Sequence, residues 1–321
     1  MPDDELRDSF SRVRSEVAKA VVGQDAAVTG LLIALLCGGH VLLEGVPGVA
    51  KTLLIRTLSR SLSLDSKRVQ FTPDLMPADI VGSEVLDEAD GRRAFRFVPG
   101  PVFCQLLMAD EINRASPRTQ SALLQAMQEQ RVAVAGVEHA LPRPFHVLAT
   151  QNPIEQEGTY PLPEAQLDRF LLEVNVGYPD LAAERAMLIA TTGASDARPA
   201  QAMTAAELLT AQALIRRVPI GDKVVDAILS LVRGGRPETA DDEIVRRHVA
   251  WGPGPRAAQA LMLACRARAL LVGADRLSPS VDDVVALARP VLRHRMALSF
   301  SARADGVVLS DVIDRLVARL G

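Results

Sequence analysis

The hydrophobic and polar positions divide the chain into two parts with different predicted elements. Before about residue 180, apolar runs without polar alternation are separated by segments of helical period. Continuous apolar runs are typical of parallel strands that are buried on both faces of a sheet. The predicted strands are VLLE (41–44), RVQF (68–71), QLLMADE (105–111), FHVLATQN (145–152) and FLLEVNVGYPD (170–180). Strands that alternate with helices predict a parallel α/β sheet.

The segments between and after these strands carry the other predicted elements. Helices are expected at 3–20, 25–37, 52–62 and 116–129, and hairpins at 83–98 and 131–141. From residue 181 onward the strand signals fade, and helices are expected at 181–191, 204–217, 223–233, 255–272, 281–297 and 307–320. We therefore place a domain boundary at Tyr178-Pro179-Asp180. It predicts an α/β domain over 1–179 and an all-helical domain over 180–321.

The composition argues against several classes of protein. The 36 basic and 39 acidic residues give a net charge of −3, which disfavours nucleic-acid binding driven by overall charge. The three cysteines have neither metal nor redox spacing, and the N-terminus MPDDELRDSF is acidic. We therefore expect a cytoplasmic protein with reduced thiols and no secretory signal. The uncharged stretch 26–43 approaches the length of a membrane span, but Gly38-Gly39-His40 interrupts it, so helix, turn and strand explain it better.

The first predicted strand runs into LLEGVPGVAKTLL (42–54), which nearly matches the phosphate-binding loop G-x-x-x-x-G-K-[ST]. Gly45 is the first glycine of the pattern, and Lys51-Thr52 are its last two residues. In such a loop, backbone N–H groups surround the phosphates, the lysine reaches the terminal phosphates and the hydroxyl binds Mg²⁺. Ala50 replaces the second glycine, and alanine is compatible with a position where the chain enters a helix.

The alternative for this segment is an apolar helix that carries a solvated lysine. It is weakened by Gly45, Pro47 and Gly48, which interrupt the segment directly after a strand. The sequence therefore favours a nucleotide site.

Polar residues also end two later strands. Asp110-Glu111 end QLLMADE, where one carboxylate can hold Mg²⁺ through water and the next can orient an attacking water. Asn152 ends FHVLATQN, where an amide can orient water against the γ-phosphate. Charged strand ends are common on any surface, and asparagine often begins a turn. The order of these residues after a phosphate loop is what favours the functional interpretation.

These segments and others in the same order closely resemble the MoxR family of AAA+ ATPases. The resemblance is carried by VVGQ (21–24), LLEGVPGVAKT (42–52), QFTPDLMPADIVG (70–82), FVPGPVF (97–103), ADEINRASPRTQSALLQAMQE (109–129), ATQNP (149–153), EGTYPLPEAQLDRF (157–170), GPGPRAAQAL (252–261) and HRMAL (294–298). Together they span almost the whole chain. The resemblance implies a P-loop AAA+ core with a C-terminal helical lid, and it makes Ala50 a family feature.

The resemblance also implies roles for the matching residues. The adenine would be lined by Val21, Val22 and Gly23, and the phosphate loop would be formed by Gly45, Val46, Pro47, Gly48, Val49, Ala50, Lys51, Thr52 and Leu53. Mg²⁺ would be bound by Thr52 and Asp110 through nucleotide and water. Glu111 would be the catalytic base, and Asn152 would be sensor 1.

Two arginines complete the site that the resemblance implies. Arg256 would be sensor 2, touching the γ-phosphate of the same subunit, and Arg169 would be the arginine finger that reaches a neighbouring subunit's nucleotide. From the residues alone, Arg256 could simply begin a helix and Arg169 could pair with Asp168 or Glu164. Arg114 and Arg118 are rival candidates for the contact between subunits.

The expected function is ATP hydrolysis by a ring, a hexamer by family resemblance. The ring would act as a chaperone-like remodelling or maturation factor for a client protein, with a von Willebrand factor A-domain protein as a partner. Two alternatives stay open: a chelatase-type motor subunit for metal insertion into a cofactor, and a nucleotide-gated scaffold that does not hydrolyse ATP. Steady-state phosphate release distinguishes the second alternative from the expected function.

Overall fold

The computed structural model describes residues 3–46, 48–49, 51–89, 92–153, 158–192, 199–272 and 278–320. A five-stranded sheet in the order β2-β5-β8-β1-β9 forms its centre, and every pairing in it is parallel. Its strands are β1 (Val41–Glu44), β2 (Ser66–Gln70), β5 (Leu106–Asp110), β8 (His146–Gln151) and β9 (Leu172–Asn175). All five predicted strands are confirmed. The inner strands β5 and β8 are apolar and buried nearly throughout, as their sequences indicated.

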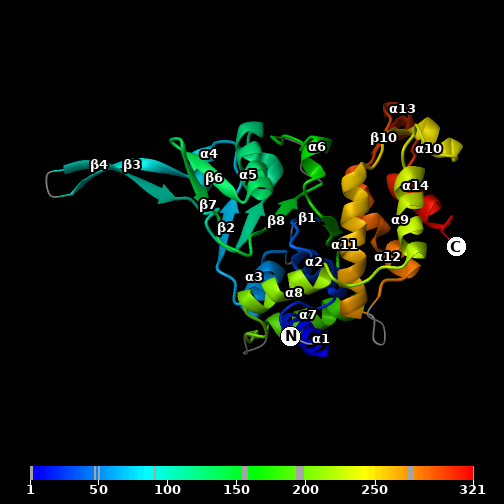
Figure 1. The fold of residues 1–321 in the computed structure, drawn as a ribbon, viewed down its shortest axis with the longest axis horizontal. Helices are drawn as coiled ribbons and strands as arrows, with labels where there is room; N and C mark the ends of the chain where they lie inside the picture. Colours follow the sequence, from blue (N-terminus) through cyan, green and yellow to red (C-terminus); the bar gives the residue numbers. More distant parts are fainter. Residues whose placement is uncertain are drawn as a thin grey trace.

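Helices pack around this sheet (Figure 1). Those before β9 are α1 (Asp3–Ala18), α2 (Asp25–Leu36), α3 (Lys51–Ser61), α4 (Pro77–Val81), the 3₁₀ helix η1 (Ile112–Arg114), α5 (Pro117–Glu129) and α6 (Glu164–Leu167). The hydroxyl of Ser116 accepts the N–H of Thr119 and so caps α5, with Pro117 at the first helical position. The uncharged stretch 26–43 forms most of α2, a turn and β1. None of the described helices has the length and apolarity that crossing a membrane requires.

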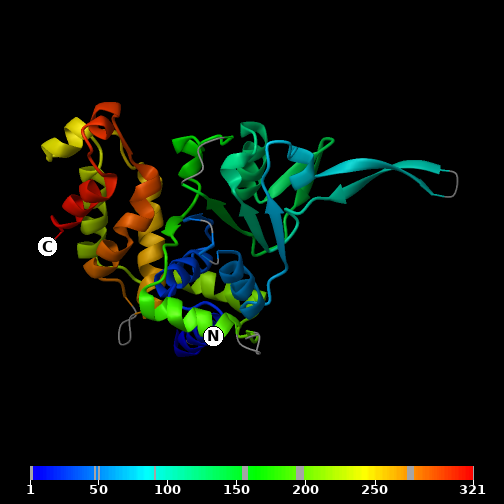
Figure 2. The same ribbon diagram turned by 180° about the vertical axis from the view of Figure 1, so that it is seen from behind.

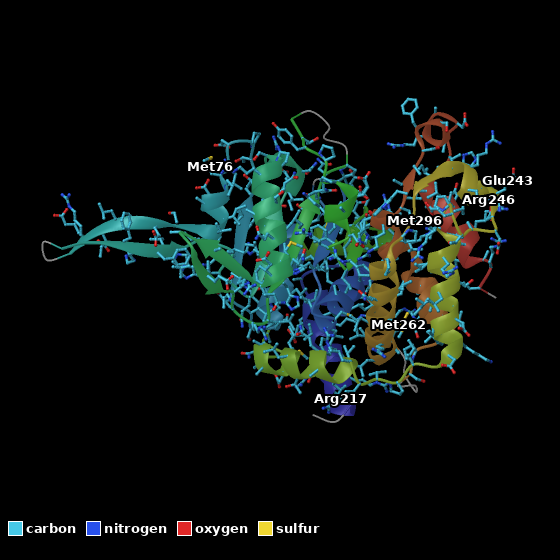
Figure 3. All side chains as sticks on the ribbon, turned by 45° about the horizontal axis from the view of Figure 1, so that its top comes forward. Met76, Arg217, Glu243, Arg246, Met262 and Met296 are labelled. Atoms are coloured by element: carbon cyan, nitrogen blue, oxygen red, sulfur yellow. The ribbon has the colours of Figure 1, made fainter. Side chains whose placement is uncertain are left out.

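Two hairpins extend the α/β part. The first pairs β3 (Gly82–Ala89) with β4 (Arg92–Pro99), and the second pairs β6 (Arg131–Val134) with β7 (Val137–Ala140). Both were predicted. The β3–β4 pair, called the arm below, projects far from the body at the end opposite α9, α12 and α14 (Figures 1 and 2). Met76, which precedes α4, lies on the side of the arm, whereas Glu243 and Arg246 lie at the other end (Figure 3).

The C-terminal part is helical apart from a short β-pair. Its helices are α7 (Leu181–Thr192), α8 (Ala205–Ile215), α9 (Asp222–Gly234), α10 (Glu243–His248), α11 (Pro255–Val272), α12 (Val281–Leu292), η2 (Arg293–Arg295), α13 (Phe300–Ala304) and α14 (Leu309–Val317). The sequence did not indicate the antiparallel pair β10 (Val249–Trp251) and β11 (Ala297–Leu298). Because η2 and β11 follow α12, that helix ends five residues before the predicted position 297.

The helices α8 and α11 join the C-terminal part to the α/β part. Gln212 on α8 donates from Nε2 to the carbonyl oxygen of Leu35 at 2.8 Å. Buried residues of α2, α8, α9, α11 and α12 belong to one continuous apolar cluster. Burial of this shared apolar surface holds the two parts against each other.

Candidate nucleotide-binding site

Polar residues from the start of α3 and from the ends of β5 and β8 meet in one cavity of about 470 Å³. This cavity, called the Lys51 cavity, lies at the carboxyl ends of β1, β5 and β8, which is where open parallel sheets bind ligands. Its lining residues are Gly48, Lys51, Thr52, Leu53, Arg56, Asp110, Glu111, Thr150 and Asn152. The structure therefore brings together the predicted lysine, hydroxyl, carboxylates and amide.

The loop between β1 and α3 has the backbone that a phosphate loop requires at two glycines. A Cβ at Gly45 would lie 2.3 Å from the carbonyl oxygen of Val176, so the backbone approaches too closely for any side chain. Gly48 has φ +87, in the left-handed region that favours glycine. Pro47 and Ala50, both predicted loop residues, lie outside the described residues.

Lys51 is the first residue of α3, and its ammonium turns back over the loop. Its Nζ donates to the carbonyl oxygen of Gly45 at 2.5 Å and lies 3.5 Å from that of Gln151 on β8. The positive charge therefore lies between the ends of β1 and β8, at the N-terminal end of a helix. A helix N-terminus adds free backbone N–H donors and a positive partial charge, which makes this position favourable for an anion.

Asp110 is held on both of its carboxylate oxygens. Its side chain is 12% exposed, and Oδ1 accepts the hydroxyl of Thr150 at 2.6 Å. Oδ2 accepts from Arg68 on the neighbouring strand, with Nη2 at 2.6 Å and Nε at 3.1 Å. The Thr150 oxygen also accepts the backbone N–H of Glu111 at 2.9 Å. The carboxylate is therefore fixed in orientation before any ligand binds.

Glu111 has an uncommon backbone conformation, with φ 55 and ψ 51. Left-handed backbone costs free energy in a residue with a Cβ, and such outliers are concentrated at functional sites. The turn breaks the strand alternation, so the side chains of Asp110 and Glu111 both line the cavity. The Glu111 Oε2 accepts from Gln70 Nε2 at 2.8 Å and from Arg114 Nη1 at 3.1 Å.

Four residues of this site or its immediate support were missed by the sequence analysis. They are Arg56, Arg68, Gln70 and Thr150. For three of them, the alternation of side chains along a strand could have placed them in the site from the sequence. Thr150 lies two positions before Asn152, and Arg68 and Gln70 are the polar positions of RVQF, so in each case strand alternation places the pair on one face.

The predicted adenine-lining segment packs beside the loop. Gln24 Nε2 donates to the carbonyl oxygen of Gly177 at 2.9 Å, and Gly23 lies against Pro179 and Ala183. The segment after β9 thus contacts both Gly23 and, through Val176, Gly45. Val21 is buried, and the described lining of the Lys51 cavity includes none of Val21, Val22 and Gly23.

The two predicted arginines lie elsewhere. The described lining of the Lys51 cavity includes neither Arg169 nor Arg256, and both line a second cavity of about 320 Å³. This arginine cavity lies at the amino ends of β1 and β9, since residues Gly39-His40 and Leu171 line it. Arg256 had been expected to reach the nucleotide of its own chain. Because α11 begins on that side of the sheet, the structure does not bring Arg256 to the Lys51 cavity of its own chain.

The arginine cavity is strongly basic. Its described lining includes four arginines (Arg169, Arg216, Arg256 and Arg295) and one acidic residue, Asp168. Arg295 is 2% exposed and donates from Nε to Asp168 Oδ1 at 2.7 Å, whereas Arg256 Nη1 lies 3.7 Å from Asp168 Oδ2 and its side chain is 51% exposed. Arg169 donates to the Leu124 carbonyl oxygen at 2.6 Å and pairs with no carboxylate in the part of the chain that the structure describes. The cavity has the charge that an anionic ligand requires.

The donors in the Lys51 cavity fit Mg²⁺. The carboxylate of Asp110 and the hydroxyl of Thr52 are oxygen ligands, which Mg²⁺ prefers, and both line the cavity. Within the described ranges, no cluster of three or more His, Cys, Asp or Glu residues could hold a metal by itself. The donor set thus suits an ion that keeps waters and also binds substrate phosphates.

Comparisons with known proteins agree with this geometry. Residues 40–172 match the family model of the ATPase family associated with various cellular activities (AAA), and residues 241–316 match the AAA lid domain. The chain is 43% identical over 310 residues to Chaperone MoxR1 of Mycobacterium tuberculosis, covering 96% of this chain and 81% of that protein. It is 35% identical over 313 residues to Protein MoxR of Methylorubrum extorquens, covering 91% and 88%.

A solved structure has the same fold. The crystal structure of a protein from Cytophaga hutchinsonii, assigned as an ATPase, superimposes with a TM-score of 0.90 at 36% sequence identity. The match covers 98% of this chain and 95% of that chain. At this coverage the similarity extends over both parts of the molecule.

Proposed function

The chain belongs to the MoxR family of AAA+ ATPases, and on this premise we propose that it hydrolyses ATP to ADP and phosphate in the Lys51 cavity. One observation carries the proposal. Lys51 and Thr52 at the start of α3, Asp110 and Glu111 at the end of β5, and Asn152 at the end of β8 line a single cavity beside a glycine loop. A cation, two carboxylates, a hydroxyl and an amide are the groups that phosphoryl transfer to water needs.

Each residue has a role that follows from its position. Lys51 and the backbone of Gly48 would hold the phosphates, and Thr52 and Asp110 would hold Mg²⁺, which when bound neutralises phosphate charge. Glu111 would orient the attacking water and accept its proton, with Asn152 beside it. The contacts of Glu111 with Gln70 and Arg114 hold its carboxylate at the edge of the cavity.

We further infer that Arg169 and Arg256 both act on the nucleotide of a neighbouring subunit. The support is that they share one basic cavity at the opposite edge of the sheet from the Lys51 cavity. Head-to-tail packing of subunits closes a ring and brings opposite edges of adjacent chains together. This assignment revises the expected role of Arg256 within its own subunit and makes hydrolysis depend on assembly into a ring, expected to be a hexamer.

The work done by hydrolysis is proposed to be remodelling or maturation of a client protein. A relative that shares 43% identity is named a chaperone. The arm adds support, because Leu86 and Phe95 on it are 52% and 71% exposed, and exposed apolar side chains on a projecting element suit contact with another protein. A von Willebrand factor A-domain protein is the proposed partner, by family resemblance.

Steady-state phosphate release tests the proposed activity. The purified full chain should release phosphate from ATP only with Mg²⁺ present. The specific rate should rise with protein concentration, because a complete site needs two chains. Tight ATP binding with no phosphate release at any concentration would support a nucleotide-gated scaffold instead.

A further inference from the structure

Arg68 on the edge strand β2 contacts Asp110 on β5, the carboxylate that is proposed to hold the metal. Residues pair in register along β2 and β5, with Gln70 opposite Asp110 and Arg68 opposite Met108. From two positions back, the Arg68 side chain reaches forward and places Nη2 2.6 Å from Asp110 Oδ2. The other oxygen, Oδ1, accepts the Thr150 hydroxyl. The guanidinium therefore covers the oxygen of Asp110 that Thr150 does not use.

A guanidinium and a divalent cation at the same carboxylate repel each other. At separations of a few ångströms this repulsion is significant even in a partly solvated site. We propose that Arg68 competes with Mg²⁺ for Asp110, so that Arg68 must move aside before the metal is held. This inference rests on the proposed function, because it assumes that the Lys51 cavity takes Mg²⁺ with the nucleotide.

The exposure of the pair favours a displaceable contact over a structural one. The Arg68 side chain is 52% exposed and that of Asp110 is 12% exposed. Because solvent reaches the half-exposed Arg68 and screens its charge, moving this guanidinium away from Asp110 costs less than breaking a fully buried pair would. Arg68 also has a second hydrogen-bond acceptor, because its Nη2 lies 3.2 Å from Gln70 Oε1. The guanidinium can therefore keep a partner on its own strand after it leaves Asp110.

The test is a Mg²⁺ titration of nucleotide binding rather than of turnover. Binding of a fluorescent, non-hydrolysable ATP analogue to the full chain would be measured over a range of Mg²⁺ concentrations. Arg68→Gln should lower the half-saturating Mg²⁺ concentration roughly two- to fivefold, the range expected for an ion pair with one half-exposed partner. Arg68→Lys keeps a cation at this position and should behave nearly as the wild type does.

Lys67→Gln is the matched control. It removes one positive charge from the same strand, but strand alternation places Lys67 on the opposite face from Arg68. Solvent and salt screen that charge from Asp110, so the Mg²⁺ dependence should stay at the wild-type value. Circular dichroism of each variant would confirm that the sheet is intact.

The outcomes separate the two proposals. If the wild type binds no nucleotide at any Mg²⁺ concentration, the proposed function fails. If the wild type binds nucleotide but Arg68→Gln needs the same Mg²⁺ concentration as the wild type or a higher one, the proposed competition is wrong and the proposed function stands. A higher requirement would show that Arg68 orients Asp110 for the metal instead of competing with it.

Discussion

Arg293, in the C-terminal part, lies with Nη2 2.7 Å from Glu44 Oε2 and so contacts the residue directly before the first glycine of the phosphate loop. The same guanidinium lies 3.1 Å from Glu173 Oε1 on β9. Two carboxylates from adjacent strands thus share one cation at the junction of the α/β part and the C-terminal part. These ion pairs join the C-terminal part to the start of the phosphate loop.

This junction predicts a stability that falls as pH rises. Burial raises the pKa of Glu173 to about 7, the neighbouring Glu44 carboxylate adds to the rise, and Arg293 opposes it. The pKa of folded Glu173 lies above the ordinary glutamate value of 4.5, so the folded state binds more protons than the unfolded state between these two values. This contribution to stability is therefore lost as pH rises from about 4.5 to 7. Glu173→Gln should flatten the dependence of the unfolding free energy on pH in this window, measured by urea denaturation. An unchanged slope would contradict the assignment.

A buried pair of histidines predicts the opposite trend at lower pH. His40 Nδ1 accepts the backbone N–H of Val147 at 3.0 Å, so its proton is on Nε2, which faces the Met127 carbonyl oxygen at 3.3 Å. His146 Nδ1 donates to the Gly39 carbonyl oxygen at 2.9 Å. Burial is the main cause that lowers the pKa of His40 to about 3 and that of His146 to about 4. Protonating His40 would place an N–H against the N–H of Val147.

The unfolded chain therefore binds more protons than the folded chain below pH 6.5, the ordinary pKa of histidine. Stability contributed by the neutral rings is complete above pH 6.5 and is lost as pH falls toward 3, by up to about 1.4 kcal/mol per pH unit for each histidine. Urea denaturation from pH 7 to 4 measures this loss. His146→Gln should reduce the acid sensitivity. Equal acid sensitivity in wild type and His146→Gln would contradict the prediction.

Replacing the proposed base should separate binding from turnover. Glu111→Gln keeps the size of the side chain but cannot accept a proton, so phosphate release should fall roughly a hundredfold or more while ATP stays bound. Lys51→Ala should instead lose nucleotide binding, because it removes the cation beside Gly45. Equilibrium binding and phosphate release would be measured on both. Glu138→Gln, on the β6–β7 hairpin, is the matched control and should keep full turnover. Normal turnover in Glu111→Gln would refute the assigned site.

Mixing two inactive variants tests where the arginines act. Arg169→Ala and Arg256→Ala should each reduce turnover by roughly two orders of magnitude or more, with ATP binding retained. If they act between subunits, mixing either one with Glu111→Gln should restore part of the phosphate release. Some interfaces would then join an intact Glu111 to an intact arginine. Arg118→Ala, the rival residue, should leave turnover unchanged.

No recovery in the mixture, with exchange of subunits shown by a fluorescent label, would mean that the arginine acts in its own chain. Recovery with Arg169→Ala but not with Arg256→Ala would restrict the contact between subunits to Arg169. The two arginines are thus tested independently.

The local pattern of the sequence determined the central sheet and the Lys51 cavity. Continuous apolar runs predicted all five strands, because a parallel strand buried on both faces has no polar alternation. Once the strands were known, Lys51, Asp110, Glu111 and Asn152 had to meet, since the carboxyl ends of neighbouring parallel strands share one edge. The hydrophobic pattern and the parallel topology were sufficient to predict that these residues lie together.

Only the tertiary structure decided which distant side chains share a partner. Arg68 and Asp110 are 42 positions apart, and their ion pair depends on the register of β2 against β5. The placement of Arg256 depends on how α11 packs against the α/β part, which no local period encodes. The same holds for Arg293 and its two carboxylates. Periodicity in the sequence indicates which face of a helix or strand is buried. The partner of a charged side chain is set instead by the packing of whole elements against one another, and this packing exists only in the folded chain.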